Sequence, residues 1–391
     1  MRVAYVCADP GVPAFGSRGS SVHLQEVVRG LGRAGAQVTL FVARPGEEPR
    51  PPDLQAVKLV PLPPLPKGDP APREQAALAN NAALRRALTA HGPFDLVYER
   101  YSLWSHAGMA FARAAGVPGV LEVNAPLLLE QRAHRALVDA EAAGRVAHSV
   151  FAAATALIAV SPGVAHYLGA FSEARGRVHV LPNGVDPDRF VPSSRDVRAQ
   201  RLRVGFAGTL KPWHGVATLV EAVARLRAQG HDLELRIVGD GPERPALAKA
   251  AVDAGLGPHI VFAGMVPYPR MPDELARFDV AVAPYPPLDR FYFSPLKIFE
   301  YMAAALPIVA SRIGDLPNVV REGQTGLLVP PGDPVALAAA IAKLARDPTR
   351  ARRMGQAGRR LVIERHSWRQ VVGRILDIAG IRQATARPRS A

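Results

Sequence analysis

A short segment of the sequence combines a turn, a cation and a carboxylate just before a buried strand. Ser294-Pro295-Leu296 predicts a tight turn into a helix, Lys297 stands in its first turn, and Glu300 follows one turn later. A helix N-terminus offers unpaired N–H groups and a positive dipole end, which favour phosphate. Lys297 adds a point charge, and a carboxylate such as Glu300 accepts hydrogen bonds from sugar hydroxyls. The segment therefore predicts a site for a diphosphate joined to a ribose.

A second group of candidate ligands follows the strand predicted over 204–207 and precedes a helix. Its members are Gly208, Thr209, Lys211 and His214. The glycine permits close approach of the backbone, and Lys211 or His214 could hold phosphate oxygens. The next predicted strand ends in Gly239-Asp240-Gly241, where a base or ribose could lie on the backbone. Asp240 either takes part in that contact or caps the following helix.

Two polar residues close a buried strand in the first half of the chain. Glu122 and Asn124 are two residues apart, so in an extended strand they point the same way. Buried polar groups need partners, so the pair either binds substrate or caps the neighbouring loop. Arg100 and Glu130 are candidates for the same region.

A glycine-containing loop lies between the first predicted strand and the first helix. It includes Gly16 and Gly19, which allow the backbone to approach a ligand at the helix start. The spacing is not that of the dinucleotide-binding G-x-G-x-x-G motif. His23, in the first helical turn, is either a structural histidine or a ligand contact.

These candidates are placed by elements that alternate between short apolar strands and longer helical patterns. The predicted strands are 3–7, 38–42, 57–62, 96–99, 120–123, 157–160, 178–181, 204–207, 235–238, 260–263, 280–283, 308–310 and 327–329. The predicted helices are 21–33, 74–90, 104–115, 127–153, 216–229, 242–254, 272–278, 296–304 and 334–345. Such alternation with near-continuous apolar strands predicts parallel sheets covered on both faces. The pattern restarts after a proline-containing linker at 182–200, which predicts two α/β domains in 391 residues.

The composition narrows the class of protein. The single cysteine, Cys7, lies in an apolar run, which excludes an internal disulfide and predicts a reducing compartment. The N-terminus enters a strand pattern directly, unlike a signal peptide. The longest apolar stretch, 146–160, is too short and too polar for a membrane span and instead predicts a helix running into a buried strand.

The net charge of +14 is concentrated at the C-terminal end. Twelve basic and three acidic residues lie between Arg346 and Ala391. This basic region is either a solvated helical face, an attachment to anionic lipid or a nucleic-acid contact. The 6% aromatic content lacks the basic and aromatic interleaving of nucleic-acid binding, so no nucleic-acid partner is expected. The segment Trp368–Asp377 is amphipathic.

The order and spacing of these motifs resemble glycosyltransferase family 4, the glycosyl transferases of group 1, in its bacterial members. The resemblance is carried by Gly205–Gly215, Val238–Pro242, Val261–Gly264, Asp279–Pro284 and Ser294–Ser311, and by Leu181–Asp186 and Gly35–Leu40. It implies the GT-B fold, in which two Rossmann-like doubly wound domains face each other across a cleft. The implied domains are an acceptor-side domain at 1–185, with a C-terminal helix at about 367–383 packed back on it, and a donor-binding domain at 186–366.

The resemblance also assigns roles to residues. Glu300 matches the glutamate that holds the ribose, the backbone of Ser294, Pro295 and Leu296 matches the phosphate turn, and Lys211 and His214 lie near the usual basic ligands. Four positions depart from the family. The first glutamate is Tyr292, the first basic position is Thr209, the second basic position is His214 rather than lysine, and the strand-end histidine is Asn124. Asp289 or Lys297 is a candidate to compensate for Tyr292.

The resulting expectation is a retaining transfer of sugar from a nucleotide-diphosphate sugar to a hydroxyl acceptor in cell-envelope or exopolysaccharide synthesis. Leaving-group charge would be offset by Lys211, His214, Lys297 and helix N-termini, while Glu122 and Asn124 would orient a sugar. No cofactor and no metal are expected, since no Asp-x-Asp motif stands at a strand end. The acceptor would be a glycan or lipid-linked, and the location cytoplasmic, at the inner membrane face if the basic region binds anionic lipid. The alternatives are a nucleotide-sugar 2-epimerase and a non-catalytic nucleotide-sugar-binding component.

Overall fold

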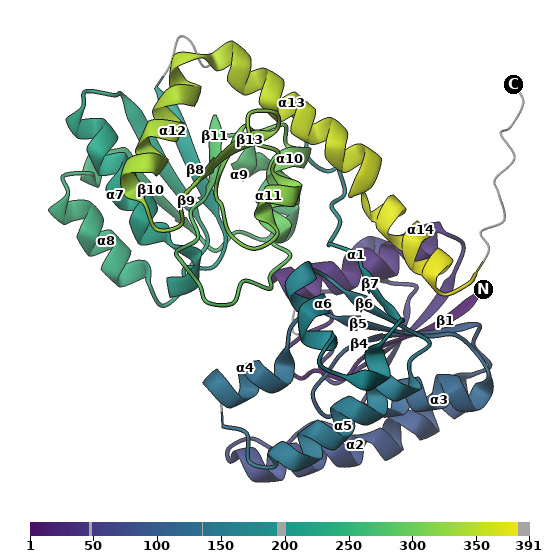
Figure 1. The fold of residues 1–391 in the computed structure, drawn as a ribbon. Helices are drawn as coiled ribbons and strands as arrows, with labels where there is room; N and C mark the ends of the chain where they lie inside the picture. Colours follow the sequence, from purple (N-terminus) through teal and green to yellow (C-terminus); the bar gives the residue numbers. More distant parts are fainter. Residues whose placement is uncertain (47–48, 135, 194–200, 382–391) are drawn as a thin grey trace, which may run out of the picture. The chain divides into compact units, whose positions relative to one another are not determined.

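The computed structural model describes residues 1–46, 49–134, 136–193 and 201–381, which form two compact α/β units (Figure 1). Unit 1 comprises Met1–Pro182, Tyr292–Ser294 and, at the C-terminal end of the described chain, residues 368–381. Unit 2 comprises Asn183–Phe291 and Pro295–Ser367. Within the predicted linker 182–200, residues 194–200 lie outside the described residues, as do residues 382–383 of the predicted C-terminal helix.

Unit 1 contains a parallel sheet of seven described strands in the order β3-β2-β1-β4-β5-β6-β7. The strands are β1 (Arg2–Cys7), β2 (Gln37–Val42), β3 (Lys58–Pro61), β4 (Leu96–Arg100), β5 (Gly119–Val123), β6 (Ala156–Ala159) and β7 (Val178–Val180). The helices are α1 (Gly19–Arg33), α2 (Pro70–His91), α3 (Ala107–Ala115), α4 (Leu127–His134), α5 (Ala140–Ala153), α6 (Pro162–Leu168) and α14 (Trp368–Ile378). Helices α2, α3 and α5 cover one face, and α1 with α14 cover the other (Figure 1).

Unit 2 repeats this arrangement with a parallel sheet of six described strands in the order β10-β9-β8-β11-β12-β13. The strands are β8 (Leu202–Ala207), β9 (Leu233–Val238), β10 (Ile260–Gly264), β11 (Val280–Ala283), β12 (Ile308–Ser311) and β13 (Gly326–Val329). The helices are α7 (Val216–Ala228), α8 (Arg244–Asp253), α9 (Met271–Leu275), α10 (Leu296–Ala303), α11 (Leu316–Val319), α12 (Pro334–Arg346) and α13 (Pro348–Arg365). Short 3₁₀ turns occur at η1 (Pro52–Leu54), η2 (Ser172–Ala174), η4 (Pro212–His214), η5 (Gly257–His259) and η6 (Tyr268–Arg270).

The sequence predictions of fold class and strands are confirmed. Every predicted strand is present, with ends displaced by at most two residues. The inner strands are continuous apolar runs buried on both faces, whereas the edge strands β3, β7 and β10 are only partly buried. The stretch 146–160 forms the end of α5 and then β6, as predicted. In both units the strand order reverses beside the first strand, between β1 and β4 and between β8 and β11. Ligands of open α/β sheets bind at the carboxyl ends of the strands at such a reversal.

One helix prediction is wrong. The single helix predicted over 127–153 is two helices, α4 and α5. The carboxylate of Glu74 accepts hydrogen bonds of 3.0 Å from the backbone N–H groups of Val138 and Asp139, which fixes a turn there. The Asp139 side chain then caps α5 by accepting from the N–H of Ala142.

None of the helices in the described part of the chain combines the length and the apolar character that crossing a bilayer requires.

Candidate functional site

The predicted donor-site residues of unit 2 gather where its strand order reverses. Gly208 directly follows β8, and its N–H donates to the carbonyl of Val238 at the end of β9, at 2.9 Å. Its φ of 147° is a conformation that glycine adopts readily. A Cβ atom at this position would lie 2.6 Å from Nζ of Lys297. The absence of a side chain at Gly208 therefore leaves the space that Nζ of Lys297 occupies.

Lys297 is the most unusual of these residues. Its Nζ atom is buried and has no hydrogen-bond partner among the described residues. Nζ lies 4.2 Å from the ring centroid of Phe206 on β8 and 5.7 Å from that of Tyr285, which follows β11. The two rings offer cation–π attraction but do not replace a counter-charge. Burial lowers the pKa of Lys297 to about 7, although the nearby carboxylate of Glu300 acts in the opposite direction.

The other two predicted phosphate cations differ from each other. His214 lies in η4, and its Nδ1–H donates to the backbone carbonyl of Thr209. Burial, together with the charges of Lys297 and Lys211, lowers the pKa of His214 to about 3, so the imidazole is neutral at pH 7. Lys211 is half-exposed, with Nζ 5.6 Å from the ring centroid of Trp213. Unit 2 thus brings two lysines and a neutral histidine to this strand end.

The Gly239-Asp240-Gly241 turn is tied to the Gly208 loop. Gly239 has φ of 129°, and a Cβ there would lie 2.0 Å from the carbonyl oxygen of Gly208. A Cβ at Gly241 would lie 2.4 Å from the carbonyl oxygen of Leu210. The loops at 208–210 and 239–241 can therefore pack this closely only because positions 239 and 241 are glycines. Asp240 accepts from the N–H of Gly241 and pairs with Arg244 at 3.0 Å. The N-cap of α8 is Glu243 and no side chain among the described residues caps this helix, so the alternative that Asp240 caps it is wrong.

The predicted phosphate turn begins α10. The chain passes from unit 1 to unit 2 between Ser294 and Pro295, and α10 starts at Leu296. No side chain caps this N-terminus, so its amide groups can serve an anion. Glu300 is buried within the same helix, one turn from Lys297. The turn, the cation and the carboxylate therefore occupy consecutive turns, as the sequence predicted.

In unit 1, Glu122 is the centre of a buried polar network. Nε2 of His23 lies 2.6 Å from its carboxylate, and Nη1 of Arg100 lies at 3.9 Å. The hydroxyl of Tyr98 and the side-chain amide of Asn124 both donate to it. Burial alone would raise the pKa of Glu122, but His23, Arg100 and Tyr98 together outweigh burial and lower that pKa to about 2. Glu122 is therefore an internal anion whose oxygens are occupied.

Asn124 is the part of this network with unused bonding capacity. Its Nδ2 donates to Glu122, whereas its Oδ1 is buried and accepts no hydrogen bond from the described residues. The hydroxyls of Tyr5 and Ser21 are likewise buried without partners in the described chain. Buried polar atoms of this kind usually find partners in water or a ligand. The sequence analysis missed Tyr5 and Tyr98, whose signal is a pair of phenols in register on adjacent strands.

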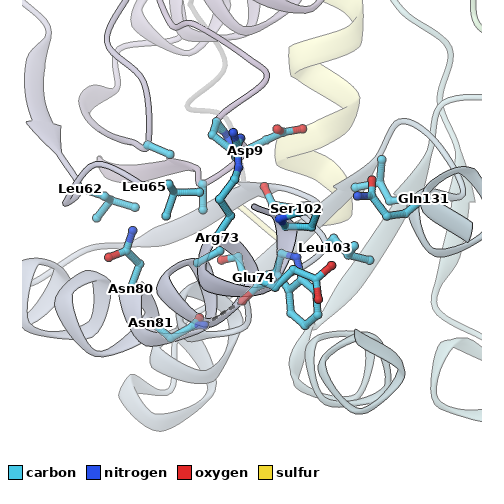
Figure 2. Close-up of a pocket in the computed structure, with 18 of the residues that line it drawn as sticks. Asp9, Leu62, Leu65, Arg73, Glu74, Asn80, Asn81, Ser102, Leu103 and Gln131 are labelled. Atoms are coloured by element: carbon cyan, nitrogen blue, oxygen red, sulfur yellow. Dashed lines mark hydrogen bonds between the residues drawn. The ribbon is translucent and has the colours of Figure 1, made fainter. Parts of the chain in front are cut away.

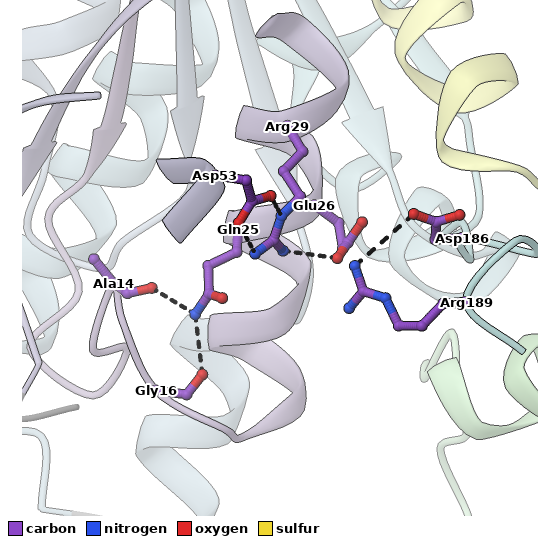
Figure 3. A network of polar contacts seen from close by, with 8 residues as sticks. All are labelled: Ala14, Gly16, Gln25, Glu26, Arg29, Asp53, Asp186 and Arg189. Carbon is purple, nitrogen blue, oxygen red and sulfur yellow. Dashed lines mark hydrogen bonds and ion pairs between the residues drawn. The ribbon is translucent and has the colours of Figure 1, made fainter. Parts of the chain in front are cut away.

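The glycine loop of unit 1 is held by the first helix (Figure 3). The Gln25 amide on α1 donates to the carbonyls of Ala14 and Gly16, at 3.0 Å each. Gly19 is the first residue of α1. A side-chain ion pair between Arg29 and Asp53, with N–O distance 2.5 Å, joins the same helix to η1. The loop is thus a fixed part of unit 1.

Unit 1 also contains a cavity of about 350 Å³ at the carboxyl ends of β1, β2 and β4 (Figure 2). Its apolar walls come from five leucines: Leu62, Leu65, Leu84, Leu103 and Leu127. Arg73 and Asp9 bring charge to the lining, and Arg73 extends from α2 toward Asp9 in Figure 2. Glu74 and Asn81 also line it, but they bind backbone N–H groups. The sequence did not predict this cavity.

Tyr292, which stands at the position of the family's first glutamate, belongs to unit 1. Its hydroxyl donates to the carboxylate of Glu130 on α4, and its carbonyl accepts from the hydroxyl of Ser161 at 2.6 Å. Burial and Glu130 raise the pKa of Tyr292. The structure therefore occupies both the hydroxyl and the carbonyl of this tyrosine with partners inside unit 1.

Comparison with known proteins agrees with this architecture. Residues 17–189 match the family described as Glycosyltransferase Family 4, and residues 201–347 match the family described as Glycosyl transferases group 1. D-inositol 3-phosphate glycosyltransferase 1 of Catenulispora acidiphila is 30% identical over 394 residues, 95% of this chain and 92% of that protein. The chain therefore belongs to glycosyltransferase family 4, the glycosyl transferases of group 1.

Two further similarities add detail. The GDP-mannose-dependent alpha-(1-6)-phosphatidylinositol monomannoside mannosyltransferase of Mycolicibacterium smegmatis is 34% identical over 235 residues, 56% of this chain and 60% of that protein. The crystal structure of Anabaena Alr3699/HepE in complex with UDP has a TM-score of 0.73 and 20% identity, over 97% of this chain and all of that one (100%). The second similarity shows the shared GT-B fold.

Proposed function

We propose that the protein transfers a sugar from a nucleotide-diphosphate sugar to a hydroxyl acceptor, with retention at the anomeric carbon. The observation that carries the donor assignment is the buried, unpartnered amino group of Lys297, set between the Gly208 loop and the start of α10. Printed names support a nucleotide donor: GDP-mannose for the Mycolicibacterium relative and UDP in the Anabaena complex. Unit 2 binds the diphosphate, and Glu300 accepts hydrogen bonds from the ribose.

The proposed reaction needs charge stabilisation more than a strong base. The acceptor oxygen forms a bond to the anomeric carbon while the bond from that carbon to the diphosphate oxygen breaks. The acceptor proton passes to the departing phosphate oxygen on the same face, which preserves the configuration. Lys297, Lys211 and the α10 N-terminus stabilise the diphosphate as it leaves. No protein base is required in this scheme.

In unit 1, Glu122 acts as a positioning residue and Asn124 as the contact to sugar. Glu122 accepts a hydrogen bond from Nδ2 of Asn124, which leaves the buried Oδ1 of Asn124 as an acceptor for a hydroxyl group. The leucine-walled cavity, with Arg73 and Asp9, suits an acceptor that carries both hydroxyl groups and an apolar part. Replacing Arg73 by Ala should raise the KM for the acceptor and leave the nucleotide Kd unchanged. A change in nucleotide Kd alone would contradict this location.

A thermal-shift screen of UDP, GDP, ADP and their sugars tests the donor assignment, and NMR analysis of products tests retention. Losing one charge-assisted hydrogen bond costs roughly 1.5–3 kcal/mol, or about tenfold to a hundredfold in affinity. Glu300→Gln and Lys297→Ala should therefore weaken nucleotide binding while the fold survives. Lys249→Ala is the matched control, because Lys249 lies on α8 in an exposed pair with Asp253. Calorimetric affinities equal to wild type in both site variants would refute the assignment.

Tyr292 favours one rival function, a non-catalytic nucleotide-sugar-binding component. Its hydroxyl binds Glu130, so the position offers no carboxylate to a donor sugar. The two functions are separated by incubation with the donor that binds most tightly. Transfer or hydrolysis above background supports the enzyme, whereas binding without turnover supports the rival.

We also propose that the basic C-terminal region attaches the protein to anionic lipid, close to a lipid-linked or envelope-glycan acceptor. Helix α13 exposes Arg352, Arg353, Arg360 and Arg365. Each basic residue close to an anionic surface contributes about 1 kcal/mol, and salt screens it over about 8 Å. Sedimentation with anionic vesicles should show binding at low salt and loss at high salt, with neutral vesicles as control. Equal binding to both vesicle types, or to neither, would leave a solvated helical face.

A further inference from the structure

The cations of the unit 2 site are not all charged before a ligand arrives. Lys297 is buried against two aromatic rings and lacks a hydrogen-bond partner in the described chain. His214, on η4, is neutral, and its one ring N–H donates a hydrogen bond to the carbonyl of Thr209. Thr209 supplies only a hydroxyl group at a position where the family resemblance implies a basic side chain. The half-exposed Lys211 is the remaining lysine of the group.

The groups that face Lys297 from each neighbouring element explain its state. Glu300 on α10 favours the charged lysine, while His214 on η4 is neutral, and Tyr285 after β11 presents its ring. Tyr301, also on α10, binds the backbone of Ala207 through its hydroxyl and carries no charge. Burial is the dominant influence and disfavours the ammonium. An anion placed beside Nζ would reverse this balance, because opposite charges within about 4–6 Å favour the charged form.

Resting on the proposed donor function, we propose that a nucleoside diphosphate binds unit 2 together with one proton, which is taken up from solvent by Nζ of Lys297. The bond formed is N–H on a neutral amine, and no other covalent bond changes. The bound state then contains an ammonium next to the diphosphate, in the space left free by Gly208. Lys297 thus supplies the positive charge that a basic side chain at position 209 would otherwise provide. It gains this charge only when the ligand binds.

Isothermal titration calorimetry measures this proton directly. When binding takes up protons, the observed heat depends linearly on the ionisation enthalpy of the buffer, and the slope counts the protons. UDP, GDP and ADP are the probes, titrated between pH 7.5 and 9 in buffers of low and high ionisation enthalpy. Over this range the terminal phosphate is already ionised, since its second pKa is about 6. The slope should rise toward about one proton as pH increases, and affinity should fall by up to about tenfold per pH unit.

Matched variants identify the titrating group. In Lys297→Met the slope should vanish and the weaker binding should no longer depend on pH in this range. Lys297→Arg, whose guanidinium stays charged, should also lose the slope. Lys211→Met removes the same charge from the half-exposed lysine and should weaken binding while the slope persists. His214→Gln should likewise preserve the slope.

The outcomes separate the two proposals. If none of the three nucleotides binds the wild-type protein, the donor function fails, and this inference fails with it. If a nucleotide binds but the slope is zero throughout, proton uptake is refuted and the donor function stands. A slope that survives in Lys297→Met or Lys297→Arg would place the proton on another group and overturn the role of Lys297. If one Lys297 variant does not fold, the wild-type pH series still tests proton uptake and the other variant still tests the role of Lys297.

Discussion

The two units share the strand order of a doubly wound sheet and differ in how they hold a buried charge at its carboxyl edge. In unit 1, Glu122 is met by His23, Arg100, Tyr98 and Asn124, and its pKa is lowered to about 2. In unit 2, Lys297 has no hydrogen-bond partner in the described chain, and its pKa is lowered to about 7. The fold is the same, but one charge is satisfied internally and the other is not.

This difference indicates a structural role for Glu122 and a ligand-binding role for Lys297. A buried charge without a partner is costly, so a chain that retains one gains something elsewhere. The Glu122 network is complete around the carboxylate and therefore fixes the end of β5 and the orientation of Asn124. Lys297 is incomplete, and perturbed, poorly partnered groups of this kind concentrate at functional sites. The comparison assigns stability to Glu122 and ligand affinity to Lys297.

The largest expected effect is on the stability of unit 1. Glu122→Ala leaves His23 and Arg100 without their anion, and breaking a buried pair costs about 3–5 kcal/mol. Trp104 and Trp368 lie in unit 1 and Trp213 in unit 2, so in a Trp213→Phe background the tryptophan emission reports on unit 1. Urea unfolding in that background measures the change. A loss below about 1 kcal/mol would show that the network is not structural.

Lys297→Met should have the opposite consequence for stability. Replacing a buried charge by an apolar side chain of similar size is often neutral or stabilising, by about 1–4 kcal/mol. We expect the nucleotide-free variant to unfold at the same or a higher temperature in scanning calorimetry. Lys249→Met, which changes an exposed lysine of unit 2, is the control. A marked destabilisation in Lys297→Met alone would assign Lys297 to structure and remove the contrast between the units.

Stability should rise with pH on account of both charges, but over two different pH ranges. The pKa of Glu122 is lower in the folded state, so its contribution is present above the usual value of 4.5 and is lost as pH falls toward about 2. The pKa of Lys297 is also lowered, so the unfolded chain binds the proton more tightly, and stability rises as pH increases from about 7 toward 10.5. Unfolding free energies across both ranges should lose the first trend in Glu122→Gln and the second in Lys297→Met. If the acidic trend persists in Glu122→Gln, or the alkaline trend in Lys297→Met, another group is responsible for that change in stability.

The smallest expected effect is that of a chelator. If lysines and a helix N-terminus supply the positive charge of unit 2, sugar transfer should continue at an unchanged rate in EDTA. Among the described residues there is no cluster of three or more His, Cys, Asp or Glu suited to a metal. Loss of activity that Mg²⁺ restores would mean that the cations of unit 2 are not sufficient.

The local sequence pattern predicted much of the fold. Apolar runs predicted every strand, because a strand buried on both faces must be apolar along its length. The pattern failed at 127–153, where Glu74, more than fifty residues earlier in the chain, fixes the break between α4 and α5. Periodicity cannot register a hydrogen bond from so distant a residue. Likewise, the sequence left Asp240 as either a ligand or a helix cap, whereas in the structure it pairs with Arg244 and the N–H of Gly241 and does not cap α8.

For the site, the sequence by itself determined which chemistry is present: a cation, a carboxylate and a helix start within seven residues at 294–300, and polar groups at the end of β5. Tertiary structure alone decided which of those charges are available. In the sequence, Glu122 and Lys297 are both charged residues near the end of a buried element. In the structure, four side chains contact the carboxylate of Glu122, whereas Nζ of Lys297 lies against two aromatic rings. The physical reason is that the pKa and bonding capacity of a buried group depend on neighbours from other strands and helices.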